Sequence, residues 1–269
     1  MALVTLDAVT LRSQDYSETS RIVSFYSRER GLIKGIAKGA RGRRGRFGST
    51  LEPLQRVRIS LAVKETRDLQ TVTQADLLHP FARLREDLFR ATYAQAVAEL
   101  LGRVVVAEHP AEEIYDLLLT VLQALEERIG DPQLIFLAFQ IHLAEALGYA
   151  LHFEACAGCG AALDEGGRLS FPHGAAFCHD CETGNGHAAD LSAGVAELGY
   201  RLGGENGIAA AAALNPSREQ RRELAGIVHR HLEYHTETLI ALRSLRIAES
   251  LEGYDSEPSS AVDLKADGE

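Results

Sequence analysis

The stretch Arg56-Val57-Arg58-Ile59-Ser60-Leu61-Ala62-Val63 decides how the first third of this chain folds. Large apolar residues occupy every second position from Val57 to Val63, and Arg56 and Arg58 stand between them. Because successive side chains of a β-strand point to opposite sides, this alternation predicts a strand with one buried and one exposed face. Other strand-like stretches in the same region span residues 4–11, 21–27, 32–38 and 69–77. Five short strands in about 80 residues predict a small closed barrel of the OB-fold type.

The first of these strands has an irregular pattern. Val4, Leu6 and Ala8 share one face, whereas Val9 and Leu11 share the opposite one. A strand whose apolar residues all face one core keeps a single parity, so the change predicts a β-bulge near Ala8.

After residue 80 the apolar residues recur at intervals of three and four, which is the spacing of one helix face. A proline stands near the start of each periodic segment, as expected for a first helical turn. The predicted helices begin near Pro80, Pro110, Asp131 and Asn215, and the third should extend to about Leu151. Polar residues interrupt the apolar run of that third helix, so it is predicted to be a buried helix and not a membrane span.

The predicted fold class is therefore α+β with several domains. An OB-fold DNA-binding barrel is expected at residues 1–80, and an α-helical domain at residues 81–153 and 188–255. A four-cysteine zinc finger is expected as an insertion at residues 154–187. The acidic, polar tail at residues 256–269 is expected to be disordered.

Two Cys-x-x-Cys pairs account for all four cysteines of the chain. They are Cys156 with Cys159 and Cys178 with Cys181. Each pair offers two thiolates on one tight turn, and Zn²⁺ prefers four such soft ligands in a tetrahedron. One structural zinc ion per chain is therefore predicted, because a site closed by four thiolates leaves no open position for catalysis.

Two other metal interpretations remain at this point. His152-Phe153-Glu154 upstream of the second cysteine pair is similar to the His-x-Glu signature of zinc deaminases, but Phe177 stands where that signature has proline. His231 and His235, with His229 nearby, lie one helical turn apart and could share a ligand. Packed histidines are the alternative explanation, since histidine tolerates intermediate burial.

Positive charge is concentrated at one end of an acidic chain. The whole sequence has 28 Lys and Arg against 38 Asp and Glu, but residues 1–67 hold 14 basic and 6 acidic residues. Eight of these cations lie within residues 28–46, and this density favours a polyanion partner. The predicted DNA-contact residues are Arg28, Arg30, Lys34, Lys38, Arg41, Arg43, Arg44, Arg46, Arg56 and Arg58.

The same region has few aromatic residues, so contacts with phosphates are expected to dominate over base stacking and to give little sequence preference. The sequence has no nucleophile elbow, no Walker-type phosphate loop and no dinucleotide fingerprint, which argues against an enzyme. It also starts without a signal-peptide pattern. The expected location is the cytoplasm, in association with the nucleoid, without membrane contact.

Several segments resemble the bacterial RecO family of DNA repair and recombination mediators. They are residues 9–23, the segment from Ser27 to Arg41, and the two cysteine pairs inserted in a helical body. The resemblance covers most of the chain and implies an OB-fold, an α-helical domain and an inserted zinc finger. Residues 242–246 are similar to the Lys/Arg-Ser-Arg ending of the family, but Leu245 precedes the last arginine, so no role is carried over to Arg246.

The resemblance also implies a function. It implies binding to single- and double-stranded DNA, strand annealing, cooperation with RecR, and loading of RecA onto DNA coated by single-strand-binding protein. The acidic, apolar tail of that protein is expected to dock on the helical body, near a cation from Arg221, Arg222 or Arg230. Two rivals are kept. A zinc-dependent nucleic-acid enzyme needs an open metal position, and a zinc-ribbon transcription factor needs a basic helix for the major groove.

Overall fold

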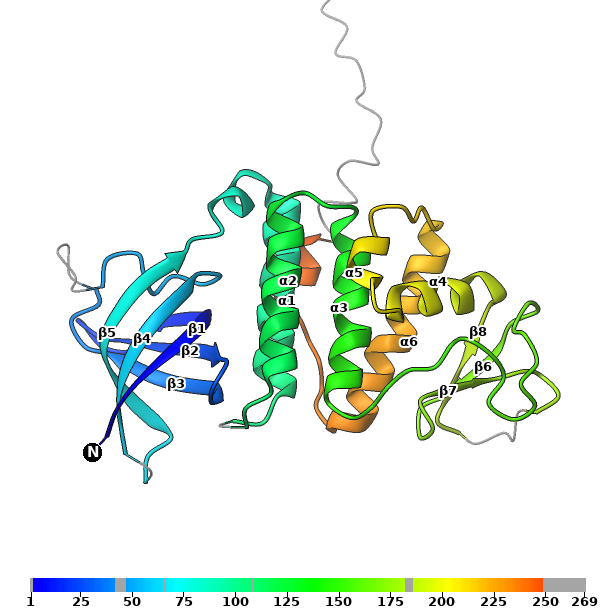
Figure 1. The fold of residues 1–269 in the computed structure, drawn as a ribbon, viewed down its shortest axis with the longest axis horizontal. Coiled ribbons are helices and arrows are strands. Elements are labelled where there is room, and N and C mark those ends of the chain that lie inside the picture. The colour runs from blue at the N-terminus through cyan, green and yellow to red at the C-terminus, as the bar shows by residue number, and fades with distance from the viewer. Residues whose placement is uncertain (1, 42–46, 65, 108, 182–185, 249–269) are drawn as a thin grey trace, which may run out of the picture.

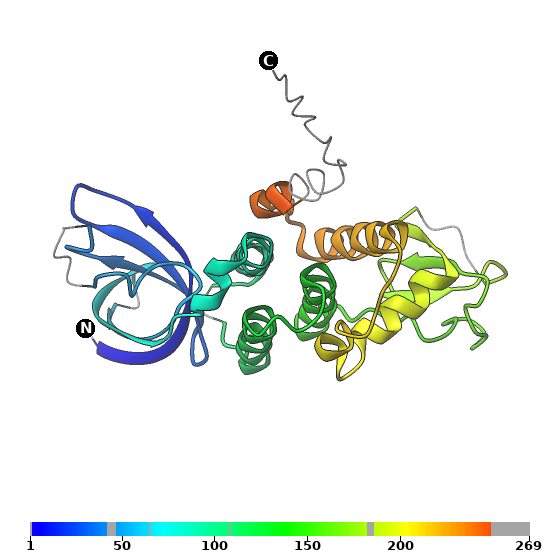
Figure 2. The same cartoon turned by 90° about the horizontal axis from the view of Figure 1, so that it is seen from above.

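A computed structural model describes residues 2–41, 47–64, 66–107, 109–181 and 186–248. The N-terminal strands form one end of the molecule, the long helices form its middle, and a second, smaller sheet forms the other end (Figures 1 and 2). The order is the same in two perpendicular views, so these three parts follow one another along the long axis.

The N-terminal strands are β1 (Ala2–Asp15), β2 (Arg21–Ser27), β3 (Gly31–Ala37), β4 (Arg56–Val63) and β5 (Leu69–His79). They form a closed barrel in the order β1-β2-β3-β5-β4, and the pairing of β1 with β4 closes it. β3 pairs in parallel with β5, whereas the other neighbours are antiparallel. The predicted OB-fold is confirmed.

The alternation of β4 has the predicted consequence. Val57, Ile59 and Leu61 are fully buried inside the barrel, whereas Arg58 is exposed. Burying each such side chain contributes about 2 kcal/mol, so the register of this strand is strongly fixed.

The sequence predicts a bulge near Ala8 as the cause of the change of parity in β1, and the structure gives a different answer. β1 pairs regularly with β2 at Ala8 and Val9, and the irregularity lies between Thr10 and Arg12. The change of parity has another cause, because Val9 and Leu11 are buried in the core of the helical body while Ala8 faces the barrel interior. Both faces of β1 are therefore buried.

Gly31, at the start of β3, has a backbone conformation that requires glycine. Its φ is +63°, and a Cβ atom there would lie 2.3 Å from the carbonyl oxygen of His109. We expect Gly31→Ala to lower the free energy of unfolding by about 3 kcal/mol. The cost of a left-handed backbone conformation at alanine adds to the cost of the clash between its Cβ and the backbone of His109. Urea denaturation measures this. Gly39→Ala is the control, since its φ is +75° but its Cβ would meet nothing within 4 Å; equal losses in both variants would contradict the clash.

The helices are α1 (Leu88–Val104), α2 (Glu112–Glu126), α3 (Pro132–Ala146), α4 (Ala193–Gly203), α5 (Gly207–Ala210) and α6 (Arg218–Thr236). Three of them begin at a side chain that accepts from the first free N–H groups. These capping residues are Asp87 for α1, Asp131 for α3 and Ser217 for α6.

Some helix boundaries differ from those predicted. α1 begins at Leu88 and not near Pro80, because a 3-10 turn at Ala82–Glu86 precedes it. α3 ends at Ala146 and not near Leu151, because the chain turns at Gly148, whose φ is +86°. The sequence interpretation did not include α4.

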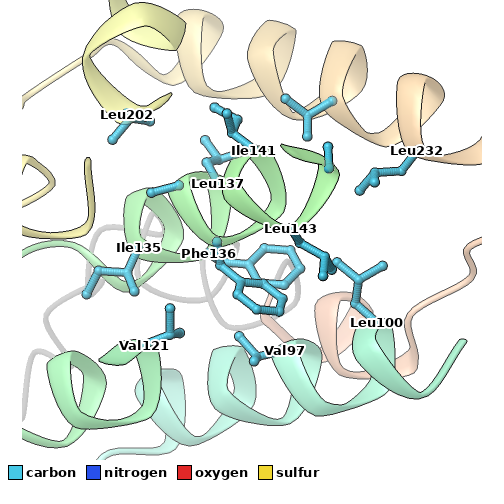
Figure 3. Close-up of a cluster of buried hydrophobic side chains, with 14 of the residues drawn as sticks. Val97, Leu100, Val121, Ile135, Phe136, Leu137, Ile141, Leu143, Leu202 and Leu232 are labelled. Atoms are coloured by element: carbon cyan, nitrogen blue, oxygen red, sulfur yellow. The ribbon is translucent and has the colours of Figure 1, made fainter. Parts of the chain in front are cut away.

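α3 is the centre of the helical body. Most of its side chains are buried, and it packs against α1, α2, α4 and α6. Figure 3 shows Phe136 between α3 and α1, with Val97 and Leu100 on the α1 side and Leu202 and Leu232 beyond α3. This confirms the predicted buried helix. Among the described residues, no helix is long and apolar enough to cross a membrane.

The second sheet is formed by β6 (Gly167–Ser170), β7 (Ala175–Phe177) and β8 (Ala188–Leu191), in the order β7-β6-β8. It lies between α3 and α4 in the chain. Its buried residues, including Leu169 and Ala176, belong to the same hydrophobic core as the helices. The sheet is therefore packed onto the helical body, and its stability is coupled to that core.

Candidate metal centre and nucleic-acid interface

Two turns beside the second sheet bring the four cysteines together. Cys156 and Cys159 precede β6, and Cys178 and Cys181 follow β7. Their four Sγ atoms all lie within 4.8 Å of one another, and those of Cys159 and Cys178 are 3.8 Å apart. A tetrahedral zinc ion at about 2.3 Å from each sulfur requires separations of about 3.8 Å. The described residues therefore fit a metal ion of this type.

The backbone of the two turns is shaped for such a site. The N–H of Gly160 donates to the carbonyl of Cys156 at 2.8 Å, and the N–H of Cys181 donates to that of Cys178 at 3.1 Å. A Cβ atom at Gly158 would lie 2.9 Å from the Cβ of Cys181, so a larger residue there would separate the pairs. Backbone N–H groups, above all that of Cys178, lower the pKa of Cys156 to about 6. A thiolate at this position favours a bound cation.

The deaminase-like residues lie apart from this cluster. His152 and Glu154 pair with each other, with Nδ1 and Oε1 3.5 Å apart, and both side chains are more than half exposed. Within the described part of the chain, the group able to hold a metal consists of the four cysteines alone. The geometry thus favours a closed thiolate site over a site of the deaminase type.

The histidines of α6 bind backbone carbonyls. The Nε2–H of His231 donates to the carbonyl oxygen of Tyr149 at 2.8 Å, and that of His235 donates to Phe171 at 2.8 Å. His235 also stacks on the Tyr149 ring, with centroids 4.5 Å apart. These contacts attach α6 to the chain before and after the first cysteine pair, which is a packing role.

Burial makes His231 sensitive to acid. Desolvation lowers the pKa of His231 to about 4. Its buried Nδ1 has no described hydrogen-bond partner, so a second ring N–H would find no acceptor there. The unfolded chain therefore binds more protons below pH 6.5, and stability falls as the pH drops from about 6.5 toward 4. We expect a loss of about 1 kcal/mol between pH 7.5 and 5.5 from this group. Chemical denaturation of wild type and His231→Gln at both pH values measures it; the same pH dependence in both proteins would contradict this origin.

Of the predicted DNA contacts, Lys34 and Lys38 lie on the outer surface of the barrel. Both side chains are exposed, and the residues between them alternate with Gly35 and Ala37 buried. Neither lysine is ion-paired with a described residue. Lys34 lies in β3 and Lys38 directly follows that strand.

Arg28 instead joins the barrel to α2. Its guanidinium binds Asp116, lies 3.5 Å from a carboxylate oxygen of Glu112, and is 5.0 Å from the ring centre of Tyr115. A phosphate could contact Arg28 only in competition with two carboxylates. The charge that the sequence offers for DNA is used here for packing between domains.

Three other predicted arginines have acidic partners within the barrel. Arg58 and Arg56 both approach Asp7, at 2.9 and 3.8 Å, and Arg41 is 3.1 Å from Asp15. Each arginine side chain is still at least 36% exposed. Exposed ion pairs contribute little, so these arginines can exchange a carboxylate for a phosphate.

The other predicted contacts are Arg30 and the three arginines that follow Arg41 in the basic segment. Arg30 is half-buried at the turn between β2 and β3, where its backbone N–H donates to the Oγ of Ser27 at 3.1 Å. Arg43, Arg44 and Arg46 lie outside the described residues.

A cleft beside Lys34 contains cations that the sequence interpretation did not single out. Arg12 of β1, Arg103 of α1 and Arg243 near the C-terminal end all line it. They are too far apart in the sequence for any local charge pattern to group them. Only the packing of α1 against the barrel brings them together.

Comparison with known proteins identifies relatives along most of the chain. The family model "Recombination protein O N terminal" matches residues 1–81, and "Recombination protein O C terminal" matches residues 85–246. A protein of Anaeromyxobacter dehalogenans (strain 2CP-C) is 35% identical over 86% of this chain and 92% of its own. One of Thermobifida fusca (strain YX) is 34% identical over 93% and 99%, and one of Symbiobacterium thermophilum is 33% identical over 75% and 80%. All three are named DNA repair protein RecO.

Proposed function

Since the chain belongs to the RecO family, and its role lies in DNA repair and recombination, we propose that it binds single- and double-stranded DNA and anneals complementary strands. The observation that carries the proposal is the basic outer surface of the barrel, where Lys34 and Lys38 are exposed and unpaired with described residues. The family resemblance adds a mediator role, in which the protein acts with RecR to load RecA on DNA coated by single-strand-binding protein. In this role the protein has no catalytic activity of its own and works in the cytoplasm at the nucleoid.

Phosphates are the main target of this surface. Phe25, Tyr26 and Phe47 are buried, whereas Tyr16 is exposed. A barrel with so few exposed rings offers little stacking for bases, so affinity arises mainly from counterion release at phosphates. Annealing follows from the same charge, because cations that screen two strands at once reduce the repulsion between them.

Zinc is the metal we propose for the cysteine cluster, one ion per chain and with a structural role. Four thiolates hold Zn²⁺ in a closed tetrahedron, and binding of the ion displaces the protons of the free thiols. No step of DNA binding passes through it. Its role is to fix the turns that carry the second sheet.

The salt dependence of binding tests the proposed function. We expect four to six phosphate contacts, which give a log–log slope of about −3 to −4 on single strands. Fluorescence polarisation with unrelated oligonucleotides of equal length, in both strand forms, measures slope and sequence preference. Annealing of labelled complementary strands is followed in parallel. Binding that does not depend on salt, or that selects one sequence strongly, would contradict the proposal.

The acidic, apolar tail of single-strand-binding protein is proposed to dock on the helical body. Of the three candidate cations, Arg221 is bound to Asp131 at the start of α3, whereas Arg222 and Arg230 are exposed. We expect Arg222→Glu to weaken binding of a peptide of that tail while DNA binding by the full chain is unchanged. Polarisation of the labelled peptide measures this, and Arg58→Glu on the barrel is the control. If only the barrel variant lost peptide binding, the docking site would lie there.

A further inference from the structure

The cleft between the barrel and α1 has the features of a second phosphate-binding surface. It has a volume of about 710 Å³ and is bounded by β1, β2 and β3 on one side and by α1 on the other. Leu11 and Ala98 line its apolar floor. At Gly102 an added Cβ would lie 3.9 Å from Leu11, so the helix approaches the strand closely at this point.

Four cations surround this floor from four separate segments. Arg12, Lys34, Arg103 and Arg243 are all exposed, and none is ion-paired with a residue that the structure describes. Like charges that line one cleft repel each other, and a polyanion bound there would screen them. The arrangement therefore calls for a ligand with several negative charges.

The cleft also has two acidic residues, which its four cations outnumber. Glu99 accepts two hydrogen bonds from Ser244, at 2.8 Å from Oγ and 3.2 Å from the backbone N–H. Its carboxylate is thus satisfied by the C-terminal segment. Asp68 is exposed, and it precedes β5.

The contact between Ser244 and Glu99 also determines where Arg243 lies. Ser244 is only 4% exposed, and residues 243–248 form a short helical segment beside α1, red in Figure 2. Because Ser244 is fixed to α1, its neighbour Arg243 is held at the cleft. Ser244 and Glu99 act as positioning residues and do not need to contact the ligand.

The cleft continues into a shallower recess lined by Lys38 and Arg67, and both hollows share Asp68 and Leu69. A basic path therefore runs from Arg103 and Arg243, past Lys34, to Lys38 on the barrel. A path of cations suits a ligand with phosphates at regular intervals, such as one extended nucleic-acid strand, and a cleft of about 710 Å³ is large enough for a small part of it.

We propose that this cleft binds the phosphodiester backbone of single-stranded DNA and guides it from the barrel to the helical body. The inference rests on the proposed DNA-binding function. A duplex is too bulky to enter a cleft of about 710 Å³, so it could contact only the rim. The cleft therefore contributes to affinity for single strands and little to affinity for duplexes.

The test compares both strand forms for the full chain carrying Arg103→Ala and Arg243→Ala together. Loss of two phosphate contacts should make the single-strand slope less negative by about 1.4 and weaken binding about 25-fold at about 0.1 M salt. Binding to a duplex of the same length should change less than about threefold. The matched control removes two exposed arginines of the helical body, with Arg201→Ala and Arg218→Ala.

Two further variants keep the positioning argument testable. Ser244→Ala should weaken single-strand binding several-fold, because Arg243 is released and the carboxylate of Glu99 is freed in the cleft. Arg243→Lys should retain most of the binding, and the melting temperature of each variant shows whether it is folded. Unchanged single-strand binding by the Arg103/Arg243 double variant, or equal losses on both strand forms, would overturn the inference. Failure of the wild type to bind DNA would instead overturn the proposed function.

Discussion

Replacing Cys178 by serine is expected to remove the metal and to lower the stability of the protein by several kcal/mol. Three thiolates bind zinc far more weakly than four, and metal binding at such sites is coupled to folding. The second sheet has only short strands, and the bulky side chains around it are few. Leu163, Leu169 and Phe171 are buried in the same core as α3 and α6, so loss of the metal also disturbs the helical body.

Elemental analysis and thermal denaturation measure this effect together. Wild type should contain one zinc per chain, and Cys178→Ser should contain little and melt at a clearly lower temperature. Asp180→Asn is the matched control, because it changes the same turn without removing a ligand. Well-folded wild-type protein without zinc would contradict the assignment, and equal loss in the control would attribute the effect to the turn.

Replacing Arg43, Arg44 and Arg46 together by alanine is expected to be the most damaging change to DNA binding. These residues form the densest part of the basic segment. Loss of three phosphate contacts should make the log–log slope on single strands less negative by about 2 and weaken binding about 100-fold at about 0.1 M salt. The loss should be similar for unrelated sequences, because phosphates carry no sequence information. Annealing should fall in parallel.

Polarisation titrations at several salt concentrations measure both quantities. The control changes three exposed arginines of the helical body, Arg201, Arg218 and Arg222, to alanine. It matches the change in net charge but not its location. Unchanged affinity and slope in the Arg43/Arg44/Arg46 variant would show that the main DNA contact lies elsewhere. An equal loss of affinity in the control would show that net charge alone causes the effect.

The sequence alone determined the features that depend on neighbours along the chain. The alternation of Val57, Ile59 and Leu61 specified a half-buried strand, because side chains of a strand alternate whatever lies beyond it. The spacing of the two cysteine pairs specified a four-sulfur cluster, because each turn alone holds two ligands close together. Asp131 with Pro132 specified the start of α3, since capping is satisfied within one turn.

The tertiary structure decided what each exposed group faces. The sequence could not show that Val9 and Leu11 pack under helices, so the parity change in β1 was interpreted as a bulge. From the sequence, Arg28 was predicted to contact DNA, whereas packing against α2 gives this arginine two carboxylate partners. A charge pattern records how many cations a segment has, but the partner of a charge depends on which distant element packs beside it. For the same reason, only the docking of α1 on the barrel and of the C-terminal segment on α1 places Arg103 and Arg243 in one cleft with Lys34.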